Sequence, residues 1–301
     1  MSLQSDPENL AAFDKLGVFD PRHGAFLETV TPLRPKLHRY CARMTGSVLD
    51  GEDVMQEALF EAYRKLDQYD QGRALSPWLF RIAHNRCIDF LRRRAVRGQA
   101  ELVAAEPDVV APVEPAGPAL GRALERLVIH LPPKERACLL LKDVFDHTLE
   151  EIAELVDSTP GGVKAALSRG RAKLAALPAP PVATPSPPAA PSDLLKLYLE
   201  RFNQRDWDGV RALTSADARL RVSDCFAGRL SDSPYFVEYQ AAATPWRMDL
   251  GQVEGETVVI TSHALPAGWT PVWVVRVTEA DGRITRIVDY WKCPWILPAA
   301  T

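Results

Sequence analysis

The stretch from Leu149 to Leu177 constrains the fold most, because its residues mark out two short helices joined by a tight turn. Thr148 and Glu151 can cap each other's free backbone amides, so a helix should begin at this point. Thr159 and Pro160 suit the N-cap and first position of a second helix, where the missing proline N–H is harmless. The pattern predicts a helix-turn-helix.

The second of these helices has an apolar side and a cationic side. The apolar side, which we expect to be buried, carries Val163, Ala166, Leu167, Gly170 and Leu174. A helix whose first turn can approach base edges while its cations meet phosphates suits a DNA major groove. The residues expected at DNA are Thr159, Gly162, Lys164, Ser168, Arg169, Arg171 and Lys173. The alternative is an ordinary helical hairpin with a solvated basic face.

Bulk composition indicates a globular chain with local basic patches. The 301 residues suffice for about two or three domains. The formal net charge is −3, so DNA contact must come from patches rather than from an overall polycation. No apolar run approaches ~20 residues and no signal-peptide pattern is visible, so we expect a cytoplasmic protein without membrane contact.

Cysteine usage argues against disulfides and metal. The five cysteines are widely spaced and form no CxxC pair, which fits reduced thiols. His38 and Cys41 lie three residues apart, but no second ligand pair accompanies them. We therefore expect no metal site, and separately we expect no cofactor and no catalytic residue.

A strongly amphipathic helix is predicted from about Gly51. Val54, Ala58, Ala62 and Leu66 share its apolar face. Its acidic and amide side chains lie mainly elsewhere: Glu52, Asp53, Gln56, Glu57 and Glu61. Taken alone, this surface is most simply a solvated helix face.

Another helix is predicted from Pro77 to about Arg94, with cations around Asn85 on its outer side. Cations around an amide suit phosphates plus a base edge. Tyr69, in the preceding polar loop, could stack on an unpaired base, whereas Trp78 and Phe80 are expected in the core. The candidate DNA-binding residues here are Tyr69, Arg81, Asn85, Arg86, Asp89, Arg92 and Arg93. A solvated cationic helix end is the alternative.

Composition shifts divide the rest of the chain. A flexible linker and a Pro- and Ala-rich spacer flank the helix-turn-helix module. The predicted division is an arm (1–20), a helical domain (21–97), a linker (98–120), a helix-turn-helix domain (121–177), a spacer (178–192) and a third domain (193–301).

The third domain has the element order of an α+β fold. Two helices, a strand and a helix precede four strands of alternating or apolar pattern, with turn signals such as Asp281-Gly282 between them. This order predicts a curved antiparallel sheet wrapped around helices. The overall fold class is therefore α+β multidomain, with two all-α domains first.

Two pairs of motifs carry a resemblance to a known family. The stretches 49–58 and 78–93 resemble the second conserved region of bacterial sigma factors of the extracytoplasmic-function group. The stretches 131–136 and 163–174 resemble the fourth. The resemblance covers roughly residues 20 to 177 and implies that the chain binds core RNA polymerase and promoter DNA.

The resemblance also implies a role for each surface. The acidic helix would dock on the clamp of the polymerase largest subunit through Asp50, Glu52, Asp53, Gln56 and Glu57. The helix from Pro77 and its loop would open the minus-ten element, and the helix from Pro160 would read the minus-thirty-five element. Where the family commonly has Arg-Ala-Arg, this chain has Gly170 between two arginines, so the end of that helix should be looser by roughly 1 kcal/mol.

The third domain resembles the SnoaL-like branch of the cone fold shared with nuclear transport factor two and ketosteroid isomerase. Such a domain is appended to some of these sigma factors, which implies regulation in cis through an intramolecular contact. The candidate pocket or regulatory residues are Asp224, Tyr235, His263, Asp289 and Tyr290. The alternative is that these side chains only fill the cone or end its strands. The family's glycine run after the equivalent of Asp224 is absent, which puts the contact made by that loop in doubt.

Three functions remain open from the sequence. The first is a sigma factor regulated by its own third domain, and the expectation is that it is not an enzyme. The second is a one-component regulator that binds operator DNA as a dimer and senses a small ligand in the cone. The third is an isomerase or cyclase of the cone fold.

Overall fold

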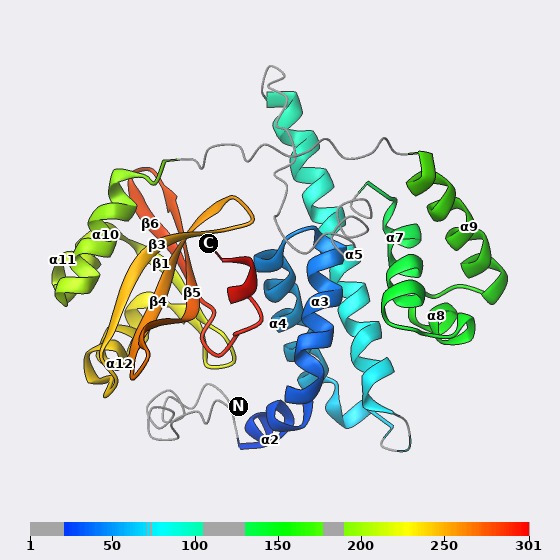
Figure 1. Cartoon of the computed structure of the whole chain (residues 1–301), viewed down its shortest axis with the longest axis horizontal. Helices are drawn as coiled ribbons and strands as arrows, with labels where there is room; N and C mark the ends of the chain where they lie inside the picture. The colour runs from blue at the N-terminus through cyan, green and yellow to red at the C-terminus, as the bar shows by residue number, and fades with distance from the viewer. Residues whose placement is uncertain (1–20, 71, 73, 105–129, 177–189, 301) are drawn as a thin grey trace. The chain divides into compact units, whose positions relative to one another are not determined.

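The chain divides into a helical unit and a unit built of helices and a sheet (Figure 1). The computed structural model describes residues 21–70, 72, 74–104, 130–176 and 190–300. One compact unit comprises Thr29–Ser186, and the other comprises Pro187–Thr301 together with the chain up to Glu28. The predicted arm, the linker from residue 105 and most of the spacer lie outside the described residues.

Three main helices form the first helical module. They are α3 (Arg34–Thr45), α4 (Val48–Arg64) and α5 (Leu75–Ala104), with α2 (Pro21–Val30) and η2 (Thr31–Leu33) before them and η3 (Leu66–Gln68) before α5. Ser47 caps α4 by accepting a hydrogen bond from the Asp50 amide at 3.2 Å. The missing side chain of Gly51 lets α4 approach α3, since a Cβ there would lie 2.4 Å from Ala42. Helix α5 continues to Ala104, past its predicted end near Arg94.

The second module is the predicted helix-turn-helix. It consists of α7 (Pro133–Leu139), the π-helical turn η4 (Leu140–Val144), α8 (Leu149–Leu155) and α9 (Pro160–Ala176). Thr148 and Glu151 form the expected reciprocal cap at the start of α8. The Thr159 hydroxyl accepts from the Gly162 amide at 3.1 Å and caps α9. The structure thus confirms the helix-turn-helix and both of its predicted caps.

The two helical modules pack against each other within their unit. The Phe145 ring, after η4, meets the rings of Tyr40 on α3 and Phe80 on α5 edge to face, with centroids 5.9 and 5.6 Å away. The Arg136 guanidinium of α7 donates to the backbone carbonyl of Met44 at the end of α3. All of these side chains are buried. Aromatic packing and a buried cation therefore join the modules.

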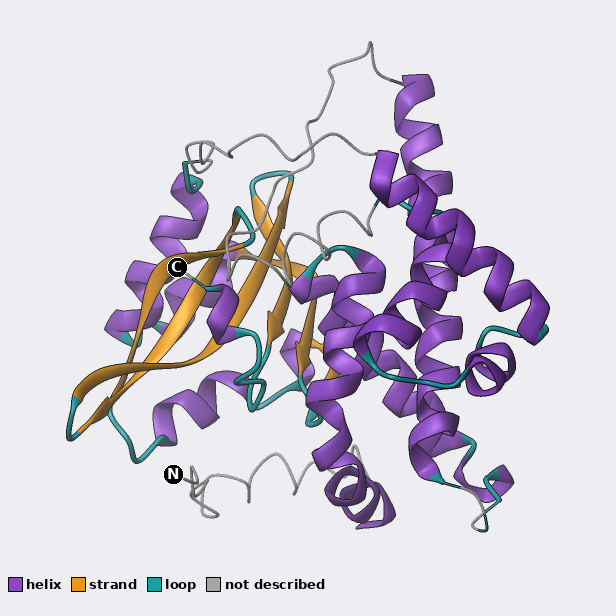
Figure 2. Ribbon diagram, turned by 45° about the vertical axis from the view of Figure 1, so that its right-hand side comes forward, coloured by secondary structure: helices purple, strands orange, loops and turns teal. Residues whose placement is uncertain are grey.

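The C-terminal unit is a curved six-stranded sheet that packs α10 (Asp193–Gln204), α11 (Trp207–Leu213) and α12 (Tyr235–Ala241) on one face (Figure 2). Its other helices are η5 (Leu230–Asp232) and η6 (Leu297–Ala299). Its strands are β1 (Thr214–Val222), β2 (Phe226–Arg229), β3 (Trp246–Val253), β4 (Glu256–Leu265), β5 (Gly268–Ala280) and β6 (Arg283–Asp289). The fold class is confirmed as α+β.

The pairing of the strands corrects one expectation. The sheet order is β2-β1-β6-β5-β4-β3, and β1 pairs with β6 in parallel. The predicted wholly antiparallel sheet is therefore wrong, and the sheet is mixed. The short strand β2, which was not predicted, pairs antiparallel with β1 at one edge. Four residues with a glycine carry too little alternation to mark a strand in the sequence.

An aromatic core holds the helices to the sheet. Phe202 of α10 is fully buried, and its ring lies within 5.6 Å of the rings of Trp207, Tyr239 and Trp246. Large aromatic side chains contribute much of the apolar burial in a small core. Among the described helices of the whole chain, none is long and apolar enough to cross a membrane.

Candidate nucleic-acid interface

Helix α9 presents the residues predicted to read the minus-thirty-five element. Val163, Ala166 and Leu167 are buried against the module, as expected. Lys164 and Ser168 are exposed on the outer side. Thr159 caps the first turn, and Pro160 and Gly161 are exposed there, so this end of the helix can approach base edges or phosphates.

Three predicted DNA contacts on α9 are also ion-paired within the module. Arg169 Nε donates to Glu135 Oε1 at 3.0 Å, and Lys173 Nζ donates to Glu135 Oε2 at 2.8 Å. On the other flank Arg171 donates to Asp143 at 2.7 Å. The lysine and arginine partners hold the pKa of the Glu135 carboxyl below its usual range, against the effect of burial. Sequence reasoning assigned no role to Glu135, because its partners lie far along the chain.

Gly170 has a packing role that the sequence did not indicate. Helix α9 runs unbroken through Gly170 to Ala176, and Gly170 is buried. A Cβ at this position would lie 2.8 Å from Leu139 Cδ1 and 3.5 Å from Glu135 Cβ. The glycine therefore allows a close approach of α7 and α9, and packing offsets its low helix propensity.

Helix α5 and its preceding loop form the second candidate DNA surface. Arg81 and Asn85 are exposed on α5, one turn apart. Tyr69 of the loop lies against Trp78, with ring centroids 4.8 Å apart and planes at 40°. Phe80 is buried as expected, but Trp78 is only half-buried. The aromatic surface here thus has two members, where the sequence indicated Tyr69 alone.

Ion pairs to α4 engage other cations of α5. Arg86 pairs with Glu61, and this carboxylate holds the pKa of the arginine above its usual range. Arg93 reaches Glu57 at 3.5 Å, and Arg92 lies 3.3 Å from Asp89 on its own helix. These pairs are partly exposed and individually weak. They place Arg86, Asp89, Arg92 and Arg93 on one continuous cationic and acidic surface.

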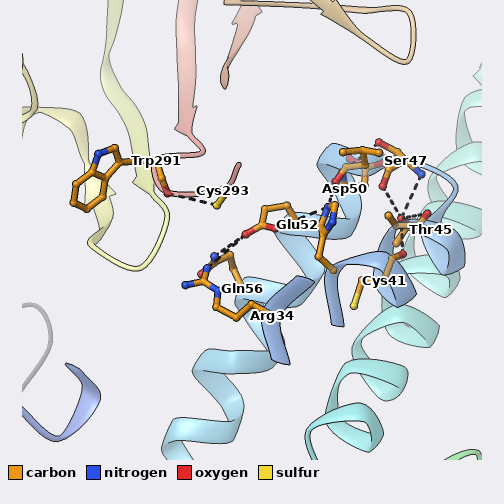
Figure 3. Close-up of polar contacts among 12 residues, drawn as sticks. Arg34, Cys41, Thr45, Ser47, Asp50, Glu52, Gln56, Trp291 and Cys293 are labelled. Carbon is orange, nitrogen blue, oxygen red and sulfur yellow. Dashed lines mark hydrogen bonds and ion pairs between the residues drawn. The ribbon is translucent and has the colours of Figure 1, made fainter. Parts of the chain in front are cut away.

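The acidic helix α4 only partly matches its predicted polymerase surface. Glu52 is fully buried: its carboxylate lies 3.9 Å from both Arg34 and His38 and accepts from Gln56 at 2.8 Å (Figure 3). The expectation that Glu52 is a surface contact is therefore corrected. Burial is the main cause that lowers the pKa of His38, while Glu52 opposes it. Asp50 and Asp53 are half-buried and Glu57 is exposed.

The C-terminal unit brings together two of its five predicted pocket residues. Asp289 Oδ2 accepts hydrogen bonds from the Tyr235 hydroxyl at 3.0 Å and the Tyr239 hydroxyl at 2.7 Å. All three side chains are buried. Burial raises the pKa of the Asp289 carboxyl to about 7, although the two tyrosines act to lower it. Sequence reasoning had missed Tyr239.

The other three predicted pocket residues lie apart from this cluster. His263 is half-buried and packs edge to face on Trp273, whose indole donates to the Tyr239 hydroxyl at 3.2 Å. Tyr290 is buried and directly follows Asp289, the last residue of β6. Asp224 sits in the β1–β2 turn with φ of 61°. A cavity of about 250 Å³ between β1 and α12 is lined by other residues, among them Arg211, Ser215 and Phe236.

Comparisons with family models agree with the two helical modules. Residues 29–97 match the model for Sigma-70 region 2, and residues 121–174 match the model for Sigma-70, region 4. The matches therefore cover the two helical modules, in the same order along the chain.

Several curated proteins and solved structures are similar. SigG, an ECF RNA polymerase sigma factor of Mycobacterium tuberculosis, is 32% identical over 228 residues, which are 66% of this chain and 61% of SigG. The chain thus spans less than two thirds of the length of SigG. The crystal structure of the M. tuberculosis ECF sigma factor SigJ has a TM-score of 0.37 at 19% identity, over 89% of this chain and 97% of that chain.

SigW, an ECF RNA polymerase sigma factor of Bacillus subtilis, is 33% identical over 162 residues, which are 50% of this chain and 87% of SigW. The chain also matches both sigma-70 regions, and these lie in the same order as its two helical modules. The chain therefore belongs to the family of extracytoplasmic-function (ECF) RNA polymerase sigma factors.

Proposed function

We propose that the chain binds core RNA polymerase and directs it to promoters, where the α5 module recognises the minus-ten element and α9 the minus-thirty-five element. The observation that carries this proposal is the pair of cationic helical surfaces on two modules that match sigma-70 regions 2 and 4. Separate phosphate-binding surfaces on linked modules suit two DNA elements at a fixed spacing.

The contact between the two modules supports a conformational change on promoter binding. Roughly 25 base pairs separate the two promoter elements, which is about 85 Å of B-DNA at 3.4 Å per base pair. In the structure, rings from the two modules lie with centroids 5.6 Å apart. This contact favours a compact arrangement of the modules, so we propose that they separate before both elements are read and that polymerase holds them apart.

We propose that Asp53, Gln56 and Glu57 of α4 form the polymerase contact. Glu57 and the adjacent Phe60 are exposed, and Phe60 is 49% accessible. Acidic side chains around an exposed ring suit a basic helical surface with an apolar seam. Glu52 is excluded from this contact by its burial.

We also propose that the C-terminal domain regulates this activity in cis by favouring one arrangement of the helical modules. The domain has its own buried core, so it can act as a rigid body linked through the spacer. If the domain binds the closed arrangement of the helical modules more tightly than the open one, it shifts the equilibrium between them toward the closed arrangement. The size of the shift equals the difference between its two binding free energies. Whether the domain inhibits or activates follows from which arrangement it prefers.

Binding and run-off transcription with core RNA polymerase test the proposal. The full chain is expected to bind core enzyme, and Glu57→Lys is expected to weaken binding at least tenfold because it reverses an exposed charge. Glu154→Lys, in α8 outside the proposed contact, is the matched control. Deletion from residue 178 is expected to change promoter-dependent transcription, and equal activity with and without the C-terminal domain would remove the regulatory claim.

The same experiment separates the alternative functions. A one-component regulator would bind operator duplex without polymerase, whereas a sigma factor needs the core enzyme to select a promoter. Tight, sequence-specific duplex binding by the isolated full chain, with no affinity for core enzyme, would replace the proposed function with that of a regulator.

A further inference from the structure

Glu135 joins two helices of the region 4 module through two cations. Arg169 and Lys173 lie one turn apart on α9, and each donates to a different oxygen of the Glu135 carboxylate. The Glu135 side chain is 7% exposed, whereas those of Arg169 and Lys173 are 58% and 49% exposed. The carboxylate is therefore the fixed member, and the cations extend from it toward solvent.

The backbone of α7 and α9 sets this arrangement. Gly170 lies between the two cations in sequence and packs against Leu139 and Glu135 of α7. A Cβ at Gly170 would come within 2.8 Å of Leu139 Cδ1, so an alanine requires the neighbouring side chain to shift. The close approach brings one carboxylate within reach of both cations.

Both cations keep donors for a second partner. Arg169 bonds through Nε, so its two terminal nitrogens lie beyond the contact with Glu135. Lys173 uses one of its three ammonium hydrogens. Because the ion pairs already order both side chains, DNA binding requires less loss of rotamer freedom.

We propose that Glu135 is a positioning residue for promoter recognition, which fixes Arg169 and Lys173 as two phosphate contacts on one flank of α9 and so sets the register of the helix in the major groove. This inference rests on the proposed function of α9. Phosphate contacts carry no sequence information themselves, but they determine which base edges the first turn of the helix reaches. Loss of the carboxylate should therefore relax sequence preference more than it weakens binding.

The test uses holoenzyme made from the full chain and core RNA polymerase. The template is a promoter found by genomic run-off transcription, with its minus-thirty-five element randomised in one library and its minus-ten element randomised in another. Glu135→Gln keeps the size of the side chain and removes the charge that holds the cations. The ratio of transcription from preferred to non-preferred minus-thirty-five sequences is expected to fall about tenfold, which is the effect of roughly one mismatched base pair.

The minus-ten library and a charge-matched variant are the controls. The minus-ten preference is expected to stay unchanged, because a general loss of structure would lower both preferences. Glu150→Gln also removes one negative charge from the region 4 module, but Glu150 is exposed in the first turn of α8 and holds none of the proposed DNA contacts. This variant is expected to change the minus-thirty-five preference by less than about twofold, since it leaves the Glu135 pair intact.

A second variant decides the result if Glu135→Gln forms no holoenzyme. Gly170→Ala keeps every charge, but its Cβ would meet Leu139 and Glu135 and should move α9 away from Glu135, so the minus-thirty-five preference should fall while the minus-ten preference stays unchanged. A wild-type minus-thirty-five preference in whichever of these two variants forms holoenzyme would overturn the inference, as would an equal loss of that preference in Glu150→Gln. A wild-type chain without any minus-thirty-five preference would instead contradict the proposed function.

Discussion

The rings of Tyr40 and Phe145 meet edge to face with centroids 5.9 Å apart, although Tyr40 lies on α3 of the first helical module and Phe145 follows η4 in the second. Each aromatic pair of this kind contributes about 0.5–1.5 kcal/mol beyond the area it buries. Phe145 also contacts Phe80, so this single side chain holds two such pairs across the modules. The closed arrangement of the helical unit therefore depends strongly on one ring.

Replacement of this ring should favour the open arrangement. If core polymerase binds only the open state, its apparent affinity decreases with the fraction of the chain that is open. Phe145→Ala should raise that fraction, so it is expected to lower the Kd for core polymerase by roughly tenfold. Fluorescence titration measures the affinity, and circular dichroism checks that the helices remain. Val96→Ala, on an exposed part of α5, is the control. Unchanged affinity in a folded Phe145→Ala protein would contradict the proposed opening.

Asp289 should make the C-terminal domain less stable as pH rises. Its pKa in the folded state is about 7, above the ordinary value of 3.8, so the folded state retains a proton that the unfolded chain has lost. The protonated carboxyl contributes its full stabilisation below pH 3.8, and this contribution is lost as the pH rises through 7. At 1.36 kcal/mol per pKa unit, the free energy of unfolding falls by about 4 kcal/mol in total. Thermal unfolding of the full chain between pH 5 and 8, followed by the near-ultraviolet signal of this aromatic-rich domain, measures the effect.

The variant Asp289→Asn isolates this carboxyl. Its amide oxygen can still accept from Tyr235 and Tyr239, but the side chain does not titrate. The melting temperature of the C-terminal transition should then stay constant where the wild type declines. A decline of equal size in both proteins would assign the pH dependence to other groups.

His84 should give the helical unit the opposite pH dependence. The Tyr40 hydroxyl lies 2.8 Å from His84 Nδ1, which is buried with it, and burial lowers the pKa of the histidine to about 4. The folded state therefore binds fewer protons than the unfolded chain between pH 4 and 6.5. Stability of the helical unit is complete above pH 6.5 and falls as pH decreases through 4, which helical circular dichroism can follow. In His84→Gln, the decrease in the free energy of unfolding on acidification should be smaller than in the wild type by about 3 kcal/mol.

Two glycines in helices should respond to alanine in opposite directions. A Cβ at Gly51 would lie 2.4 Å from the backbone of Ala42, so Gly51→Ala should destabilise the helical unit by about 1–3 kcal/mol. A Cβ at Gly24 would meet nothing within 4 Å, so Gly24→Ala should be neutral or stabilise α2 by up to about 1 kcal/mol. Thermal denaturation compares the two variants. Equal melting temperatures would show that α3 and α4 adjust to the extra methyl group.

Local features of the fold were predictable because neighbouring residues encode them. The reciprocal cap of Thr148 and Glu151 and the cap at Thr159 involve residues three apart, and the structure confirms each. The helices α10, α11 and α12 of the C-terminal domain and five of its six strands likewise follow from the sequence pattern. The parallel pairing of β1 with β6 did not follow, because strand direction depends on the path of the whole chain.

Contacts between distant segments explain the rest of the differences. The sequence shows that Arg169, Arg171 and Lys173 are cations, but it does not show that α7 and η4 supply carboxylates to them. Similarly, Glu52 belongs to an acidic pattern, yet Arg34 and His38 from another helix enclose it. Which charges face a partner and which serve the fold is decided by tertiary packing.

Genomic run-off transcription with purified core RNA polymerase is the decisive measurement for sigma activity. With the full chain added, or the chain shortened at residue 178 if the C-terminal domain inhibits, we expect discrete start sites that share two upstream elements. Asn85→Ala should shift the preference at the minus-ten element alone, and Lys164→Ala that at the minus-thirty-five element alone. A chain that neither binds core enzyme nor produces start sites in either form would contradict the account.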